Sequence, residues 1–184
     1  MRIAVAALVL TLVVAVPAVA DEPEPYVRSC ATSQFGELGQ DWQERAIVAG
    51  HVAFVGLKNG YERWRPAGPG AWPLKVVVVV DPNAAPTVTI AERSRAHASL
   101  GYNDVRFRGG GSVPLSRGAE SVRFAACRAV LSREPWNRGT QFGGVFLVSG
   151  RRCVYIEIAT QGKVIRRALR FGVPRCAWLP TPDA

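Results

Sequence analysis

The sequence is poor in the residues and motifs that catalytic and metal sites use. It has two histidines, His51 and His97, and no serine or carboxylate is adjacent to either. The Gly-x-Ser-x-Gly and His-Glu-x-x-His motifs are absent, as is a phosphate-binding loop of the Walker form. Carboxylates are few in the strand-rich stretch from Ser121 to Phe171, and Glu157 stands alone in its strand pattern, which offers no acid–base pair of the glycosidase kind. We therefore expect no catalytic residue, no cofactor and no metal site.

Long apolar runs are also missing after residue 20. Before it, the sequence has the form of a secretory signal: Arg2, an apolar run over residues 3–16, and the small-x-small triplet at residues 18–20. An uncleaved anchor is the alternative, but this run is shorter than the ~20 residues that span a bilayer. We expect a signal peptide (1–20), an extended leader (21–29), one domain (30–176) and a flexible tail (177–184), without a transmembrane span after cleavage.

All four cysteines follow the expected signal. An even number of cysteines in an exported chain favours two disulfides, and neither histidine lies near them at metal-ligand spacing. Three pairings are possible. We expect Cys127–Cys153, because each residue ends a strand of the same predicted stretch, and Cys30–Cys176, which would join the two ends of the domain.

Acidic residues are scarce relative to basic ones. The chain has 23 Lys and Arg against 14 Asp and Glu, a net charge of +9, and most of the basic residues are arginine. A basic exported protein meets anionic polymers of the cell envelope or an acidic exported partner rather than nucleic acid. We expect a secreted or cell-wall-associated protein, although a GC-rich genome would also enrich arginine.

Period-2 alternation with turn residues predicts a β-protein. We expect strands over Ile47–Leu57, Leu74–Val80 and Pro86–Ala91, with a further one over Ala98–Tyr102. From Ser121 to Phe171 we expect an antiparallel meander joined by tight hairpins. Seven or eight short strands without a convincing helix predict an immunoglobulin-like β-sandwich, with a small closed barrel as the alternative.

Two groups of residues are candidate binding surfaces. The first is an arginine stripe on outward strand positions and one turn, which would contact anions: Arg123, Arg151, Arg152, Arg166 and Arg170. The second is Trp136-Asn137-Arg138, an aromatic platform with polar neighbours that would suit a sugar or a protein partner. The alternatives are a solvated sheet face for the arginines and a core-capping role for the tryptophan.

Several segments together resemble a group of small exported actinobacterial proteins of unknown function. They are the strand 74–80, Ser121-Val-Arg-Phe-Ala-Ala-Cys127, Thr140-Gln-Phe-Gly-Gly-Val-Phe-Leu-Val148, Arg152-Cys-Val154 and the closing residues 171–176. The resemblance covers about residues 47–176. It implies a secreted β-sandwich with spaced cysteines in its second half, and no catalytic residue.

These observations favour a non-enzymatic exported β-sandwich that binds a component of the cell envelope. Two alternatives remain at this stage. One is a hydrolase whose site combines His51 or His97 with an acid distant in the sequence. The other is an inhibitor or adhesion protein that uses the loop from Ser132 to Thr140.

Overall fold

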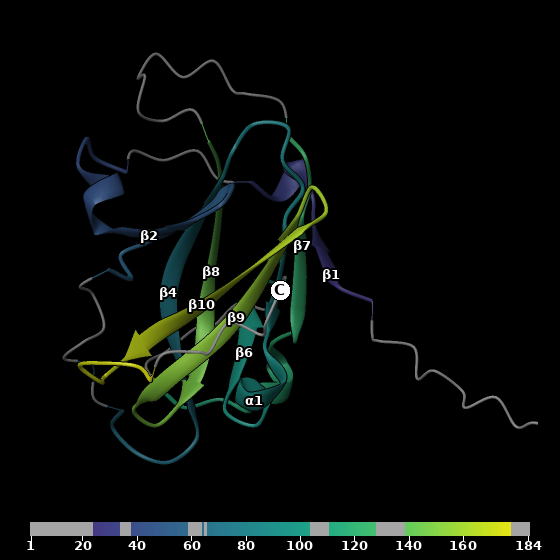
Figure 1. Ribbon diagram of the computed structural model, residues 1–184. Coiled ribbons are helices and arrows are strands. Elements are labelled where there is room, and N and C mark those ends of the chain that lie inside the picture. Colours follow the sequence, from purple (N-terminus) through teal and green to yellow (C-terminus); the bar gives the residue numbers. More distant parts are fainter. Residues whose placement is uncertain are drawn as a thin grey trace, which may run out of the picture.

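The computed structural model describes residues 24–33, 38–58, 64, 66–103, 111–127 and 139–177. In these residues, ten strands form two five-stranded sheets packed as a sandwich (Figure 1). The first sheet has the order β1 (Tyr26–Arg28), β7 (Ser121–Phe124), β5 (Thr87–Ile90), β9 (Arg152–Thr160) and β10 (Lys163–Phe171). The second has the order β2 (Ala46–Ala49), β3 (Val52–Val55), β4 (Ala71–Val80), β8 (Thr140–Ser149) and β6 (Ala98–Gly101). Four short helical turns connect the strands: η1 (Cys30–Thr32), η2 (Trp42–Arg45), α1 (Glu92–Arg95) and η3 (Leu115–Arg117).

The predicted all-β sandwich is confirmed, with ten described strands rather than seven or eight. In the described part of the chain, β1 and β10 end the first sheet, and β2 and β6 end the second. Both sheets are therefore open there, in contrast to the closed barrel considered as the alternative. No described helix has the length and apolar character needed to cross a bilayer.

The long pair β4 and β8 forms the centre of the second sheet, in register from Ala71↔Ser149 to Val80↔Thr140. Val76 and Val78 are fully buried and face the first sheet, while Lys75 is exposed on the opposite face. Gly144 of β8 leaves room over the strand for Tyr102, whose hydroxyl donates to Val76 O at 2.9 Å. Tyr102 can therefore pack in the core only because position 144 of β8 is a glycine.

The single strand expected over Ile47–Leu57 is wrong. The chain reverses at Gly50 and His51, so the segment forms the two paired strands β2 and β3, with Ala49 opposite Val52. Gly50 has φ +58°, a conformation that glycine adopts without steric cost. His51 fits the alternation of a continuous strand, and for that reason the turn was not recognised in the sequence.

The meander expected from Ser121 to Phe171 is also wrong. The turn after β8 carries the chain from the second sheet to the first, and β5 lies between β7 and β9. The hairpin β9–β10 is confirmed, with Gln161 and Gly162 at φ +47° and +75°. Alternation shows which side chains face the core, but both sheets have a core face, so it does not identify the sheet to which a strand belongs.

Both expected disulfide pairings are wrong, although all four cysteines are bonded. The bonds are Cys30–Cys127 and Cys153–Cys176, with Cα–Cα distances of 5.7 and 5.6 Å. Strands β1 and β7 run parallel, so Cys30, which follows β1, lies beside Cys127, which follows β7. After β10 the chain turns at Gly172, at φ +69°, and brings Cys176 back to β9. Parallel pairing and this reversal are tertiary features that cysteine spacing does not show.

Candidate binding site

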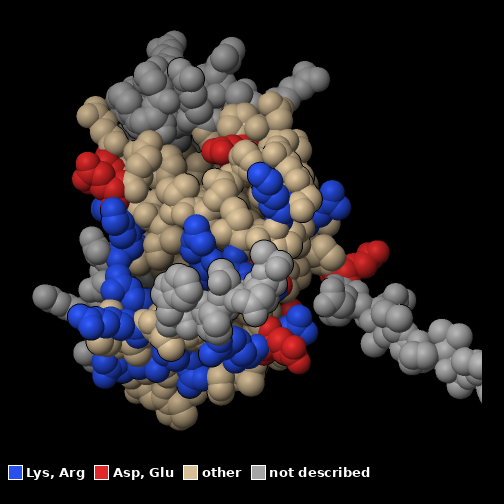
Figure 2. Space-filling view, in the orientation of Figure 1, with Lys and Arg blue, Asp and Glu red and all other residues tan. Residues whose placement is uncertain are grey.

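A group of arginines lies at the end of the sandwich where β9 begins and β10 ends. We call this group the basic end; its members are Arg93, Arg151, Arg152, Arg170 and Arg175. Arg170 lies opposite Cys153 in the β9–β10 register, and Arg152 opposite Phe171. Figure 2 shows Lys and Arg side chains over the lower half of the face that carries β9 and β10. Three of the predicted stripe residues, Arg151, Arg152 and Arg170, therefore lie at this end of the hairpin, although Arg170 is on the outer face and Arg152, opposite the buried Phe171, is on the core-facing side of β9.

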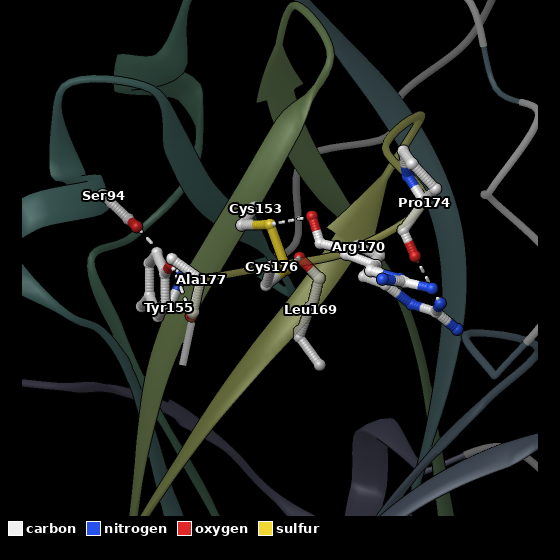
Figure 3. Close-up of a disulfide and its surroundings, with 9 residues drawn as sticks. Ser94, Cys153, Tyr155, Leu169, Arg170, Pro174, Cys176 and Ala177 are labelled. Carbon is white, nitrogen blue, oxygen red and sulfur yellow. Dashed lines mark hydrogen bonds between the residues drawn. A yellow bond between two sulfur atoms is a disulfide. The ribbon is translucent and has the colours of Figure 1, made fainter. Parts of the chain in front are cut away.

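The segment Gly172–Ala177, which we call the C-terminal strap, crosses the outer face of the first sheet (Figure 3). Its Cys176 is bonded to Cys153 of β9, and Ala177 O accepts a hydrogen bond from the Tyr155 hydroxyl at 3.2 Å. Arg170 Nη1 donates to Pro174 O at 2.8 Å. These contacts, together with a hydrogen bond from Arg151 Nε to Gly172 O, hold the strap, and Arg175 with it, against the sheet.

Tyr155 is the centre of the covered part of this face. Its side chain points outward from β9, yet it is only 7% exposed. The Arg93 guanidinium lies 4.0 Å from its ring centroid, a cation–π contact. The neighbouring Ser94 is buried, and its Oγ accepts a hydrogen bond from the Tyr155 amide at 2.9 Å. These contacts fix α1, and therefore Arg93, on the sheet.

Four of the five arginines of the basic end have no carboxylate partner among the described residues. Elsewhere, arginine pairs with carboxylate in Arg45–Asp41, Arg95–Glu120 and Arg166–Glu157. No carboxylate in the described ranges pairs with Arg93, Arg151, Arg152 or Arg175. Arg151 Nε donates to Gly172 O at 2.6 Å, which orients this exposed side chain at the turn. The arrangement can attract an anion and donate several hydrogen bonds to it.

The predicted arginine stripe is divided in the structure. Arg123 of β7 and Arg166 of β10 share the outer face of the first sheet, but β5 and β9 lie between their strands. Arg166 Nε donates to Glu157 Oε1 at 2.8 Å, which offsets its charge. The alternation of apolar and polar residues correctly predicted that both side chains lie on one face of the sheet. It does not specify the order of the strands, and that order separates the two arginines.

The predicted tryptophan site, Trp136-Asn137-Arg138, lies outside the described residues, as does most of the loop from Ser132 to Thr140. Trp64 packs against the core and Trp42 is buried in a second, smaller cluster. Trp72 belongs to β4 and donates Nε1 to Gly68 O at 3.2 Å.

One histidine has an acidic partner that the sequence analysis missed. His51 Nδ1 lies 3.0 Å from Asp81 Oδ2, and Asp81 N donates to His51 O at 3.0 Å. The two residues are 30 positions apart and meet because β3 pairs with β4. Their side chains are 38% and 62% exposed, and no serine of the described segments hydrogen-bonds to His51. Nor do those segments bring three metal-binding side chains together.

Comparisons with known proteins add no assignment. No family model matches the chain, and neither the curated proteins nor the solved structures compared with it include a significant match. The resemblance to small exported actinobacterial proteins therefore stays a prediction from the sequence segments. Function has to be argued from the geometry of the described residues.

Proposed function

We propose that the protein is an exported, non-enzymatic β-sandwich whose basic end binds an anionic polymer of the cell envelope. One observation carries the proposal: arginines from α1, the β8–β9 turn, β9 and the C-terminal strap meet at one end without carboxylate partners in the described segments. A dispersed basic surface that served only solubility would be interspersed with acidic residues. The basic end is instead a local concentration of positive charge.

The chemistry of guanidinium groups fits this ligand class. Each arginine presents several donors in a planar fork that matches carboxylate, phosphate or sulfate oxygens. The side chains project from α1, the β8–β9 turn, the strands and a strap held by a disulfide, so binding orders little backbone. A polymer that presents repeated anionic groups would contact several of these arginines at once, which raises the effective affinity.

Export is a second part of the proposal. Two disulfides are typical of an oxidising, extracellular environment. The signal-like residues 1–20 provide a route of secretion, and the acid-poor composition suits association with an anionic cell wall. The immunoglobulin-like character and the actinobacterial relationship remain predictions.

Retention of the secreted protein on a sulfated-dextran column tests the proposal. We expect elution only at raised salt, because salt screens attraction between solvent-exposed charges. Arg175→Gln and Arg151→Gln should each elute at lower salt than the wild type. Their urea unfolding curves show whether the domain remains folded.

Arg123→Gln is the matched control. It removes the same charge from an exposed position on the same sheet face, two strands away from β9. If retention depends on the basic end, this variant elutes close to the wild type. Equal losses in all three variants would mean that net charge alone causes retention, and absence of retention would refute the proposed function.

A further inference from the structure

The outer face of the first sheet has a second feature, separate from the basic end. A hollow of about 490 Å³ lies over β5 and its neighbours, a volume within the range of ligand-binding clefts. We call it the polar trough; it is lined by Glu24, Pro25, Thr87, Thr89, Arg95, Glu120, Ser121, Glu157, Ala159 and Val164. None of its lining residues belongs to the basic end.

Short side chains on adjacent strands create the floor of the trough. Thr87 of β5 lies opposite Ala159 of β9, and Thr89 lies opposite Ser121 of β7. Their inward neighbours, such as Val88, are fully buried, so the short side chains must face outward. Longer side chains stand at the borders, which leaves the centre of the face hollow.

The floor and the borders present both donors and acceptors. Thr89 Oγ1 and Ser121 Oγ are 2.8 Å apart and share one hydrogen bond, while the side-chain hydroxyl of Thr87 hydrogen-bonds to no described residue. Glu120 is paired through Oε2 with Arg95, and Glu157 through Oε1 with Arg166. Each carboxylate thus has a second oxygen that can accept from a ligand, and its charge is offset by its arginine.

This chemistry excludes two classes of ligand. A polyanion would gain little here, because Arg95 is already paired with Glu120, Arg166 is already paired with Glu157, and Glu24 adds a negative charge. An extended peptide would require unpaired backbone groups, but β5 and β9 are each paired on both sides. The hydroxyl and carboxylate groups of the trough instead match a ligand with many neutral hydroxyl groups.

We propose that the polar trough binds an uncharged oligosaccharide through its hydroxyl groups. The hydroxyls of Thr87, Thr89 and Ser121 contact the sugar from the floor, and the second oxygens of Glu120 and Glu157 accept from the sugar hydroxyls. No aromatic platform is among the lining residues, so affinity is modest, with a Kd on the order of 1 mM. The site is independent of anion binding at the basic end.

The test is an NMR titration of the ¹⁵N-labelled secreted protein with cellohexaose, chitohexaose and maltohexaose, each to about 10 Kd. We expect shifts of the amides of Thr87, Thr89, Ser121 and Glu157 with at least one sugar. The shifts should persist in about 1 M NaCl, where the Debye length is about 3 Å. Anion binding at the basic end would be lost at this salt concentration. Failure of the sugar proposal can therefore be distinguished from failure of the anion-binding proposal.

Variants locate the site. Ala159→Phe, at an exposed strand position, should fill the trough and abolish the shifts, and Thr89→Val should weaken binding by roughly 2- to 10-fold. Val27→Thr, an exposed position on the same face outside the trough, should bind as the wild type does. The proposal is overturned if no sugar shifts these amides, if Ala159→Phe still binds, or if hexaalanine binds in place of the sugars.

Discussion

Replacement of Gly144 by alanine should destabilise the core more than any exposed substitution. A Cβ at this position would lie 2.5 Å from Tyr102 Cε1 and 2.6 Å from Cγ, about 1 Å short of the ~3.5 Å of a normal carbon contact. Tyr102 cannot easily move, since Phe124 and Phe146 contact its ring at centroid distances of 5.5 and 6.3 Å. The added methyl group therefore has to displace a packed aromatic ring.

The expected cost has two parts. Overpacking of a dense core costs about 1–3 kcal/mol. Displacement of the ring also breaks the buried hydrogen bond from the Tyr102 hydroxyl to Val76 O, which contributes about 1 kcal/mol. Together we expect a loss of about 2–4 kcal/mol from the free energy of unfolding. This is a large part of the ~5–15 kcal/mol that stabilises most domains.

Urea unfolding under non-reducing conditions measures this loss. Gly68→Ala is the control, because a Cβ there meets no atom within 4 Å, and its effect should be within about 0.5 kcal/mol. Tyr102→Ala combined with Gly144→Ala should cost less than the sum of the single changes, because the clash is removed. A loss below 0.5 kcal/mol for Gly144→Ala, or additive effects in the double variant, would refute this account of the core.

Further predictions concern the basic end and the disulfides. Ser94→Ala should lower the free energy of unfolding by about 1–3 kcal/mol, because it leaves the Tyr155 amide without its buried acceptor; an unchanged urea midpoint would contradict this. Removal of Cys153–Cys176, which closes a loop of 23 residues, should lower the free energy of unfolding by about 3.5 kcal/mol. Removal of Cys30–Cys127, which closes a loop of 97 residues, should lower it by about 4.7 kcal/mol. Urea unfolding of the two paired Cys→Ser variants measures both losses. A non-reducing peptide map should recover these two pairs, and recovery of Cys127–Cys153 would show the disulfide assignment to be wrong.

Local patterns predicted several elements because their signals lie within a few residues. The valine run behind Leu74 indicated a buried strand, and β4 extends through it. Gln161-Gly162 indicated a reversal, and it joins β9 to β10. Side-chain direction was also local: Arg123, Arg166 and Arg170 face outward as the period-2 pattern predicts.

The candidate site was less predictable because it depends on long-range pairing. Arg93 was not singled out, and it reaches the site only because Tyr155 of β9 lies beneath α1. Arg175 was not singled out either, since the chain had first to turn at Gly172 and bond Cys176 to β9. The polar trough combines residues of β5, β7, β9 and β10, whose order no alternation pattern specifies.

Residue alternation and composition are sufficient to indicate an all-β sandwich with paired cysteines and a strong excess of basic residues. They do not specify which strands are neighbours, which cysteines are bonded to each other or which arginines lie together, because these depend on the tertiary structure. The physical reason is that a strand with one apolar face can pack in either sheet, and the choice is made by pairing between residues far apart in the chain.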